Sequence, residues 1–142
     1  MYKKLMDVVN YLKTALEPYI RNGTKLILDG AGYYGKSIRR TLNDVDFICF
    51  ADKNPQEDLL MGLPVISRKE AAQEYKDALF IITSMVYGSQ IKKELEEFGV
   101  KILNFGELLN KNSAIRDNQY YDVLRFSDDE VISVSYTHLR AH

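Results

Sequence analysis

A glycine-rich turn between an apolar run and an amphipathic run constrains this sequence more than any other feature. Gly30, Gly32 and Gly35 follow the apolar residues 26–28 and fit the spacing G-x-G-x-x-G. In a strand–turn–helix unit, the first glycine allows the tight turn, the second lets a phosphate approach the backbone, and the third lets helix and sheet pack closely. Residues 25–42 therefore predict a turn whose free N–H groups, helped by the helix dipole, hold a phosphate.

Apolar runs alternate with amphipathic runs beyond this turn, which predicts a parallel sheet covered by helices. The runs expected to form buried strands are residues 26–28, 46–51, 78–83 and 100–105. If the strand at 78–83 returns beside the first strand, the strand order reverses at the glycine turn and leaves a crevice there. The predicted fold class is α/β, a three-layer Rossmann-like parallel sheet with flanking helices, preceded by an N-terminal helix.

Three local signals mark the other elements. Residues 2–20 have apolar side chains at helical spacing, so we expect a helix that packs on the domain or links it to another unit, with Pro18 disturbing its end. Ser67-Arg-Lys-Glu70 fits a capping box and predicts the start of a helix. Residues 62–66 are expected to form an edge strand, because Pro64 has no N–H to donate within a central ladder.

Polar and aromatic residues beside the expected crevice are the candidate ligand contacts. Asp52 follows the second strand about 20 residues beyond the glycine turn, where a dinucleotide-binding fold places the carboxylate that binds the ribose. It is equally plausible that Asp52 only begins a turn. Thr83 and Ser84 follow the third strand, where their hydroxyls can reach a phosphate or ribose, or cap the next helix. Tyr33 and Tyr34 are expected either to wall the site or to be loop aromatics without a ligand.

Composition narrows the possible partners. The 142 residues carry a formal net charge of -1, which gives no reason to expect nucleic acid or an anionic membrane as the partner. No apolar run approaches the roughly 20 residues of a membrane span, and no secretory signal pattern is present. The single cysteine, Cys49, excludes an intrachain disulfide and fits a reducing compartment. We therefore expect a cytoplasmic protein in which Cys49 is a buried, inert thiol.

The C-terminal residues 134–142 look like one reading frame of a common sequencing-library adapter, although they could also be a genuine polar tail. We expect the natural sequence to depart near Ser133. Both histidines, His138 and His142, fall in this tail, so no metal site or histidine base is predicted. The expected organisation is an N-terminal helix (1–23), a Rossmann-like nucleotide-binding domain (24–110), a linker with the start of a further domain (111–133), and the tail.

The order of these motifs resembles the N-terminal Rossmann-like domain of FkbM-type methyltransferases. The similar stretches are residues 28–36, 47–55, 62–67, 76–84 and 120–131. The resemblance implies that the last stretch leads into a domain that binds S-adenosylmethionine, and that this sequence stops before the binding loop. The methyl-transfer residues would then be absent, and this part alone would be inactive. Asp29 departs from the family's pattern, and a carboxylate there is expected to repel a phosphate.

The sequence is compatible with several functions. The leading interpretation is a module that binds a nucleotide-sugar or an NAD-like dinucleotide, with the three glycines at the phosphates and Asp52 at the ribose. A similar domain precedes the β-helix of sugar O-acyltransferases, although the hexapeptide repeats expected there are not seen. An NAD-dependent oxidoreductase and a scaffold that binds no nucleotide also fit the pattern. No catalytic residue is predicted, because no nucleophile, base and orienting group are found together.

Overall fold

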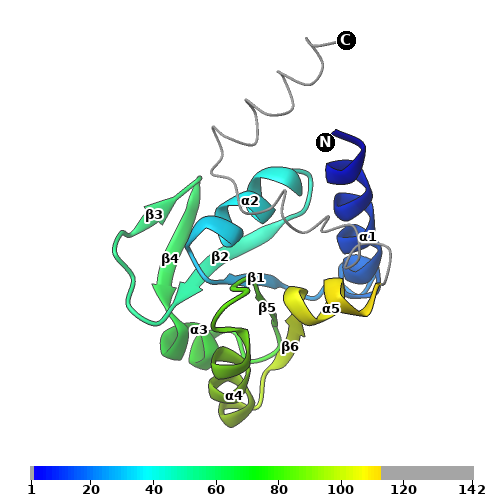
Figure 1. The fold of residues 1–142 in the computed structure, drawn as a ribbon. Helices are drawn as coiled ribbons and strands as arrows, with labels where there is room; N and C mark the ends of the chain where they lie inside the picture. Colours follow the sequence, from blue (N-terminus) through cyan, green and yellow to red (C-terminus); the bar gives the residue numbers. More distant parts are fainter. Residues whose placement is uncertain (1, 113–142) are drawn as a thin grey trace.

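The computed structural model describes residues 2–112, with side chains from residue 7 onward, and these residues form an α/β fold (Figure 1). A six-stranded, mostly parallel sheet is flanked by helices, as the sequence predicts. In chain order the elements are α1 (Tyr2–Arg21), β1 (Leu26–Asp29), α2 (Tyr33–Thr41), β2 (Phe47–Asp52), β3 (Leu59–Leu60), β4 (Leu63–Ser67), α3 (Arg68–Glu74), β5 (Leu79–Ile82), α4 (Gly88–Phe98), β6 (Lys101–Asn104) and α5 (Phe105–Lys111).

The strand order, β3-β4-β2-β1-β5-β6, places the strand of the glycine turn at the centre of the sheet. β1 pairs in parallel with β2 on one side and with β5 on the other. The chain thus moves outward from β1 to β4 and then returns to β5. The order reverses at β1, as expected, and an open parallel sheet leaves a crevice at the carboxyl ends of its strands at such a point.

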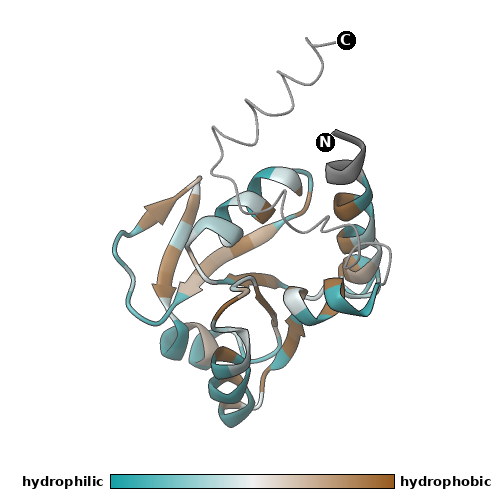
Figure 2. Cartoon of the chain, viewed as in Figure 1, coloured by the Kyte–Doolittle hydropathy of each residue, from teal (hydrophilic) through white to brown (hydrophobic). Residues whose placement is uncertain are grey.

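The two faces of the sheet carry separate hydrophobic clusters, because successive side chains of a strand point to opposite faces. On β1, Leu26 and Leu28 pack into one cluster with residues of α1, α2 and α5. Ile27 packs into the other cluster with residues of α3 and α4. Figure 1 shows α3 and α4 on the opposite side of β1 from α2, and Figure 2 shows the strands as the most hydrophobic part of the ribbon. The structure therefore has the three layers that the sequence predicts.

The N-terminal helix packs on the sheet and spans nearly the predicted residues. Val8, Leu12 and Leu16 are fully buried in the first cluster. Pro18 lies inside α1, and the expectation that it disturbs the helix end is wrong. Pro18 has no N–H to donate within the helix, but its carbonyl accepts a hydrogen bond from the Asn22 amide at 3.2 Å, so the last turn still closes. The helix ends at Arg21, and Gly23 just beyond it has a φ of +74°, the left-handed conformation that glycine commonly supplies after a helix.

The strand at residues 62–66 is not the edge of the sheet, which corrects a second prediction. β4 pairs in parallel with β2, and the two-residue strand β3 covers its other side in antiparallel pairing. The hairpin between β3 and β4 has positive φ at both Met61 and Gly62. A two-residue strand has no periodicity that a sequence can reveal. Pro64 is accommodated because the register of β4 with β2 begins one residue later, at Val65, so this pairing does not include Pro64.

Several expectations concern residues 113–142, which lie outside the described part of the chain. They include the linker and the start of a further domain (111–133), except its first two residues, the similar stretch at 120–131, and the adapter-like tail with its two histidines. Within residues 2–112, no helix combines the length and the apolar character that crossing a membrane requires.

Candidate functional site

The glycine turn between β1 and α2 is held by close backbone contacts. Gly30 has a φ of +117°, and its amide donates to the Ala51 carbonyl at 2.7 Å. A Cβ on Gly30 would lie 2.6 Å from the Thr83 hydroxyl, and a Cβ on Gly35 would lie 1.9 Å from the Gly30 carbonyl oxygen. Neither position has room for a side chain. The first and third glycines therefore have the structural roles that the motif predicts: the tight turn and the close approach of α2.

Gly32 differs from the other two glycines because nothing lies within 4 Å of the place where its Cβ would be. Its backbone is extended, with φ of -89°, which any residue adopts. Gly32 is the N-cap of α2, and no side chain caps this helix start. The first residues of α2 contribute to the wall of a cavity, and the position of a Gly32 Cβ is open, which is compatible with the phosphate-binding interpretation.

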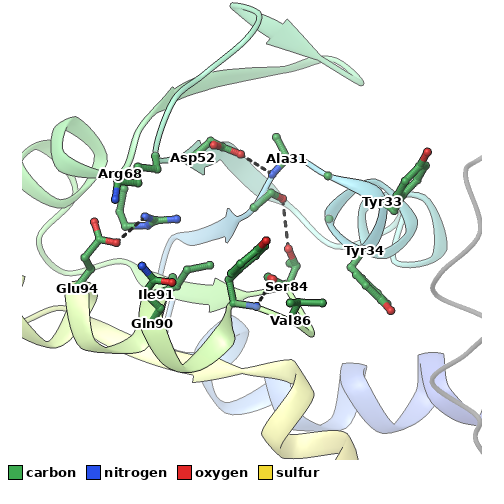
Figure 3. A pocket seen from close by; sticks show the side chains of 16 residues that line it. Ala31, Tyr33, Tyr34, Asp52, Arg68, Ser84, Val86, Gln90, Ile91 and Glu94 are labelled. Carbon is green, nitrogen blue, oxygen red and sulfur yellow. Dashed lines mark hydrogen bonds and ion pairs between the residues drawn. The ribbon is translucent and has the colours of Figure 1, made fainter.

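A cavity of about 430 Å³ lies at the carboxyl ends of β1, β2 and β5, beside the start of α2. Its size falls in the range of small-molecule sites. Figure 3 shows the glycine turn and Asp52 on one side of it and the loop between β5 and α4 on the other. All eight residues that the sequence nominates contribute to its wall: Gly30, Gly32, Tyr33, Tyr34, Gly35, Asp52, Thr83 and Ser84.

Asp52 begins a turn, which is one of the two roles that the sequence left open, and it also contacts the glycine turn; its role toward a ribose stays a prediction. One carboxylate oxygen accepts a hydrogen bond from the Ala31 amide at 3.2 Å, and the other accepts from the Asn54 amide at 3.2 Å. The first contact fixes the glycine turn to the end of β2, and the second forms the local turn. A carboxylate has about four lone-pair positions, so both oxygens can still accept hydrogen bonds from hydroxyl groups of a ligand.

Thr83 and Ser84 hold the two loops that flank the cavity. The Thr83 hydroxyl is buried and donates to two carbonyl oxygens, that of Asp29 at 3.0 Å and that of Gly30 at 3.3 Å. Ser84 accepts a hydrogen bond from the Tyr87 amide at 2.9 Å, just before α4 begins. These contacts tie β5 to the glycine turn and form a local turn before α4, whose N-cap is Tyr87, so Ser84 does not cap the helix itself. The predicted contacts of both hydroxyls with a phosphate or ribose remain predictions.

Exposed apolar side chains border the cavity, and sequence reasoning found only part of this rim. Tyr33 is 66% exposed, whereas Tyr34 is partly buried against the first hydrophobic cluster. Val86 and Tyr87 also contribute to the cavity wall and are 77% and 64% exposed; Figure 3 shows Val86 in the loop between β5 and α4. Both residues follow Ser84 in the same loop, so their position after the third buried strand is the sequence signal that could have identified them. The rim offers apolar and aromatic surface to a flat or ring-shaped ligand group.

A buried charge cluster forms the floor of the cavity and was not predicted. Arg68 on α3 donates to both carboxylate oxygens of Asp29, from Nε at 2.8 Å and from Nη2 at 2.7 Å. Its Nη1 donates to Glu94 on α4 at 3.2 Å. The sequence located Arg68 only as the first residue after the helix cap Ser67. No local pattern indicates that this side chain reaches β1, 39 residues away in sequence.

The pairing with Arg68 changes the expected effect of the Asp29 carboxylate on a bound phosphate. Burial raises the pKa of the Asp29 carboxyl, while its two hydrogen bonds with Arg68 oppose that rise. Burial also opposes the charge of Arg68, but the contacts with Asp29 outweigh it and raise the pKa of the guanidinium. The side chain of Asp29 is 0% exposed and lies against Arg68, so the positive charge of the guanidinium balances the negative charge of the Asp29 carboxylate. The structural basis for expecting Asp29 to repel a phosphate is therefore weakened.

The described residues contain no arrangement for metal binding or thiol chemistry. Within residues 2–112, no group of three His, Cys, Asp or Glu side chains could hold a metal ion. Cys49 is buried in the second hydrophobic cluster, as predicted, and burial raises the pKa of its thiol to about 12. The thiol therefore stays protonated near neutral pH and is a poor nucleophile.

Comparison with known proteins identified no relative of this chain. The sequence matches no protein-family model and no curated protein. The function is therefore argued from the cavity itself.

Proposed function

We propose that this chain is a nucleotide-binding module of the Rossmann type, which takes a nucleotide-sugar or an NAD-like dinucleotide. One observation carries the proposal: the uncapped start of α2 and the open position at Gly32 face the cavity at the point where the strand order reverses. A helix start without a side-chain cap has N–H groups that need an acceptor, and an anionic group supplies one.

Each part of the cavity has a distinct task in this proposal. The diphosphate lies above Gly32, where no Cβ keeps it from the backbone. The ribose hydroxyls donate to the Asp52 carboxylate, which already stands at the end of β2. The apolar side chains of Tyr33, Val86 and Tyr87 cover the remainder of the ligand. No step of chemistry is assigned to these residues, because the arrangement binds and orients without a nucleophile and base.

The test is a melting experiment on the whole chain with UDP-glucose and with NAD, each at millimolar concentration. A ligand that binds only the folded state raises the melting temperature, by an amount that grows with its concentration. We expect Gly32→Asp to abolish the rise. The new carboxylate repels the diphosphate, yet Asp is a favourable N-cap and should stabilise the unliganded fold by roughly a few tenths of a kcal/mol relative to Gly.

Gly32→Ala is the matched control, because its methyl group has open space and carries no charge. It should weaken binding less than Gly32→Asp does. Absence of a melting shift with either nucleotide in the wild-type protein would favour the scaffold interpretation. A shift with NAD alone, weakened in Asp52→Ala, would favour an NAD-binding oxidoreductase domain.

The parent protein is a separate part of the proposal. The resemblance to FkbM-type methyltransferases supports a module that precedes a domain for S-adenosylmethionine. The uninterrupted reading frame of the source beyond the codon for Ser133 tests this. A glycine-containing loop for S-adenosylmethionine is the expected continuation, and hexapeptide repeats would instead indicate a sugar O-acyltransferase.

A further inference from the structure

Arg68 forms ion pairs with two carboxylates that differ in their number of hydrogen bonds and in their burial. Asp29 uses both oxygens, at 2.7 and 2.8 Å, and its side chain is 0% exposed. Glu94 uses one oxygen at 3.2 Å, and its side chain is 36% exposed. Figure 3 shows Glu94 directed at Arg68 from α4, at the edge of the cavity. A bidentate buried pair is held far more firmly than a single, partly exposed contact.

The Glu94 carboxylate can therefore move away from Arg68 without disturbing the pair that Arg68 forms with Asp29. Asp29 alone matches the charge of Arg68, so the guanidinium stays neutralised when Glu94 rotates toward solvent. The rotation exposes one face of a nearly buried guanidinium to the cavity, since Arg68 and Glu94 both contribute to its wall. The Nη1 group that Glu94 releases would then need a new acceptor.

We propose that Glu94 occupies the place on Arg68 that a ligand carboxylate takes, so that the cavity accepts a nucleotide-sugar whose sugar is acidic. This inference rests on the proposed function and adds a second anion position to it, apart from the start of α2. A ligand carboxylate reproduces the planar group that Glu94 already presents, whereas a dianionic phosphate would add charge beside Asp29 and Asp52. Glu94 is thus a specificity-determining residue that competes with the ligand.

The experiment compares UDP-glucuronate with UDP-glucose, which differ only in the carboxylate, by titration calorimetry on the whole chain. Glu94→Gln keeps the size of the side chain and removes the competing charge. We expect this variant to bind UDP-glucuronate at least about fivefold more tightly than the wild-type protein does, because a like charge and a competitor are lost together. Its affinity for UDP-glucose should change by less than about twofold, since that ligand brings no carboxylate to Arg68.

Glu96→Gln is the matched control, because Glu96 lies on the same helix, is exposed and does not contribute to the cavity wall. It makes the same change in net charge and should leave both affinities unchanged. An equal gain for both ligands in Glu94→Gln, or no gain for either, would overturn the inference while the nucleotide site stands. Binding of NAD without either sugar nucleotide would also overturn the inference alone. Failure of all three nucleotides to bind the wild-type protein would overturn the proposed function as well.

Discussion

The glycine turn and the Arg68 cluster are two walls of one cavity, and they are built in opposite ways. The turn is a continuous stretch from β1 into α2, and it offers backbone N–H groups. The cluster joins side chains from β1, α3 and α4, with a sequence separation of 39 for Asp29 and Arg68 and of 26 for Arg68 and Glu94. One wall is neutral and is shaped by the absence of side chains, whereas the other depends entirely on charged side chains.

Despite this difference, binding and stability are divided within each wall and not between the two walls. At the turn, Gly32 is open to the cavity while Gly30 and Gly35 are closely surrounded by neighbouring atoms. In the cluster, Asp29 is buried beneath Arg68 while Glu94 is partly exposed. Each wall thus combines a part that the fold needs with a part that can respond to a ligand.

The largest expected effect tests the buried part of the cluster. Arg68→Met leaves the Asp29 carboxylate buried without its partner, and we expect the free energy of unfolding to fall by about 3–5 kcal/mol. Urea denaturation followed by circular dichroism measures this. The double variant Asp29→Leu/Arg68→Met removes both charges and should recover most of the loss. A loss below about 1 kcal/mol in the single variant would mean that the pair is not the fixed part of this wall.

The corresponding test of the turn compares two identical substitutions. Gly35→Ala forces a methyl group against the Gly30 carbonyl and should lower the free energy of unfolding by about 1–3 kcal/mol, despite the better helix propensity of alanine. Gly32→Ala should change it by no more than about 0.5 kcal/mol. Both values come from the same denaturation experiment. Equal losses at the two positions would remove the distinction between a packing glycine and a ligand-facing glycine.

Asp52 links the turn to the end of β2, and its removal should have an intermediate effect. Asp52→Ala loses the hydrogen bonds to the Ala31 and Asn54 amides, so we expect a loss of about 1 kcal/mol in the free energy of unfolding. Asp52→Asn keeps an acceptor oxygen and should lose less. An unchanged stability in Asp52→Ala would show that the carboxylate does not hold the turn and leave only its proposed role toward a ribose.

The smallest effect is expected at the exposed part of the cluster. Glu94→Gln should lower the free energy of unfolding by no more than about 1 kcal/mol, because its single contact with Arg68 is partly exposed and screened by salt. The same urea titration at low and at high salt measures it. A loss as large as that of Arg68→Met would place Glu94 among the fixed groups and make its exchange for a ligand group untenable.

The local parts of this protein were predictable because their signals are short in sequence. The glycine spacing indicated the turn, the alternation of runs indicated the parallel sheet, and the Ser67 cap was correctly located, with the Glu70 amide donating to its hydroxyl. All eight nominated residues contribute to one cavity wall because chain order and the preference for right-handed crossovers bring these strand ends together. The strand β3 was missed because a two-residue strand is fixed by its pairing with β4 and has no local signal.

The sequence by itself determined the fold class, the glycine turn and the nomination of Asp52, since each depends on the order of neighbouring residues. Only the tertiary structure decided that Asp29 is neutralised in place by Arg68, that Thr83 holds the turn, and that Glu94 stands at the cavity edge. The physical reason is that a buried charge must find its partner through space. Which distant side chain supplies that partner depends on how helices pack across the sheet, and no short pattern in the chain records it.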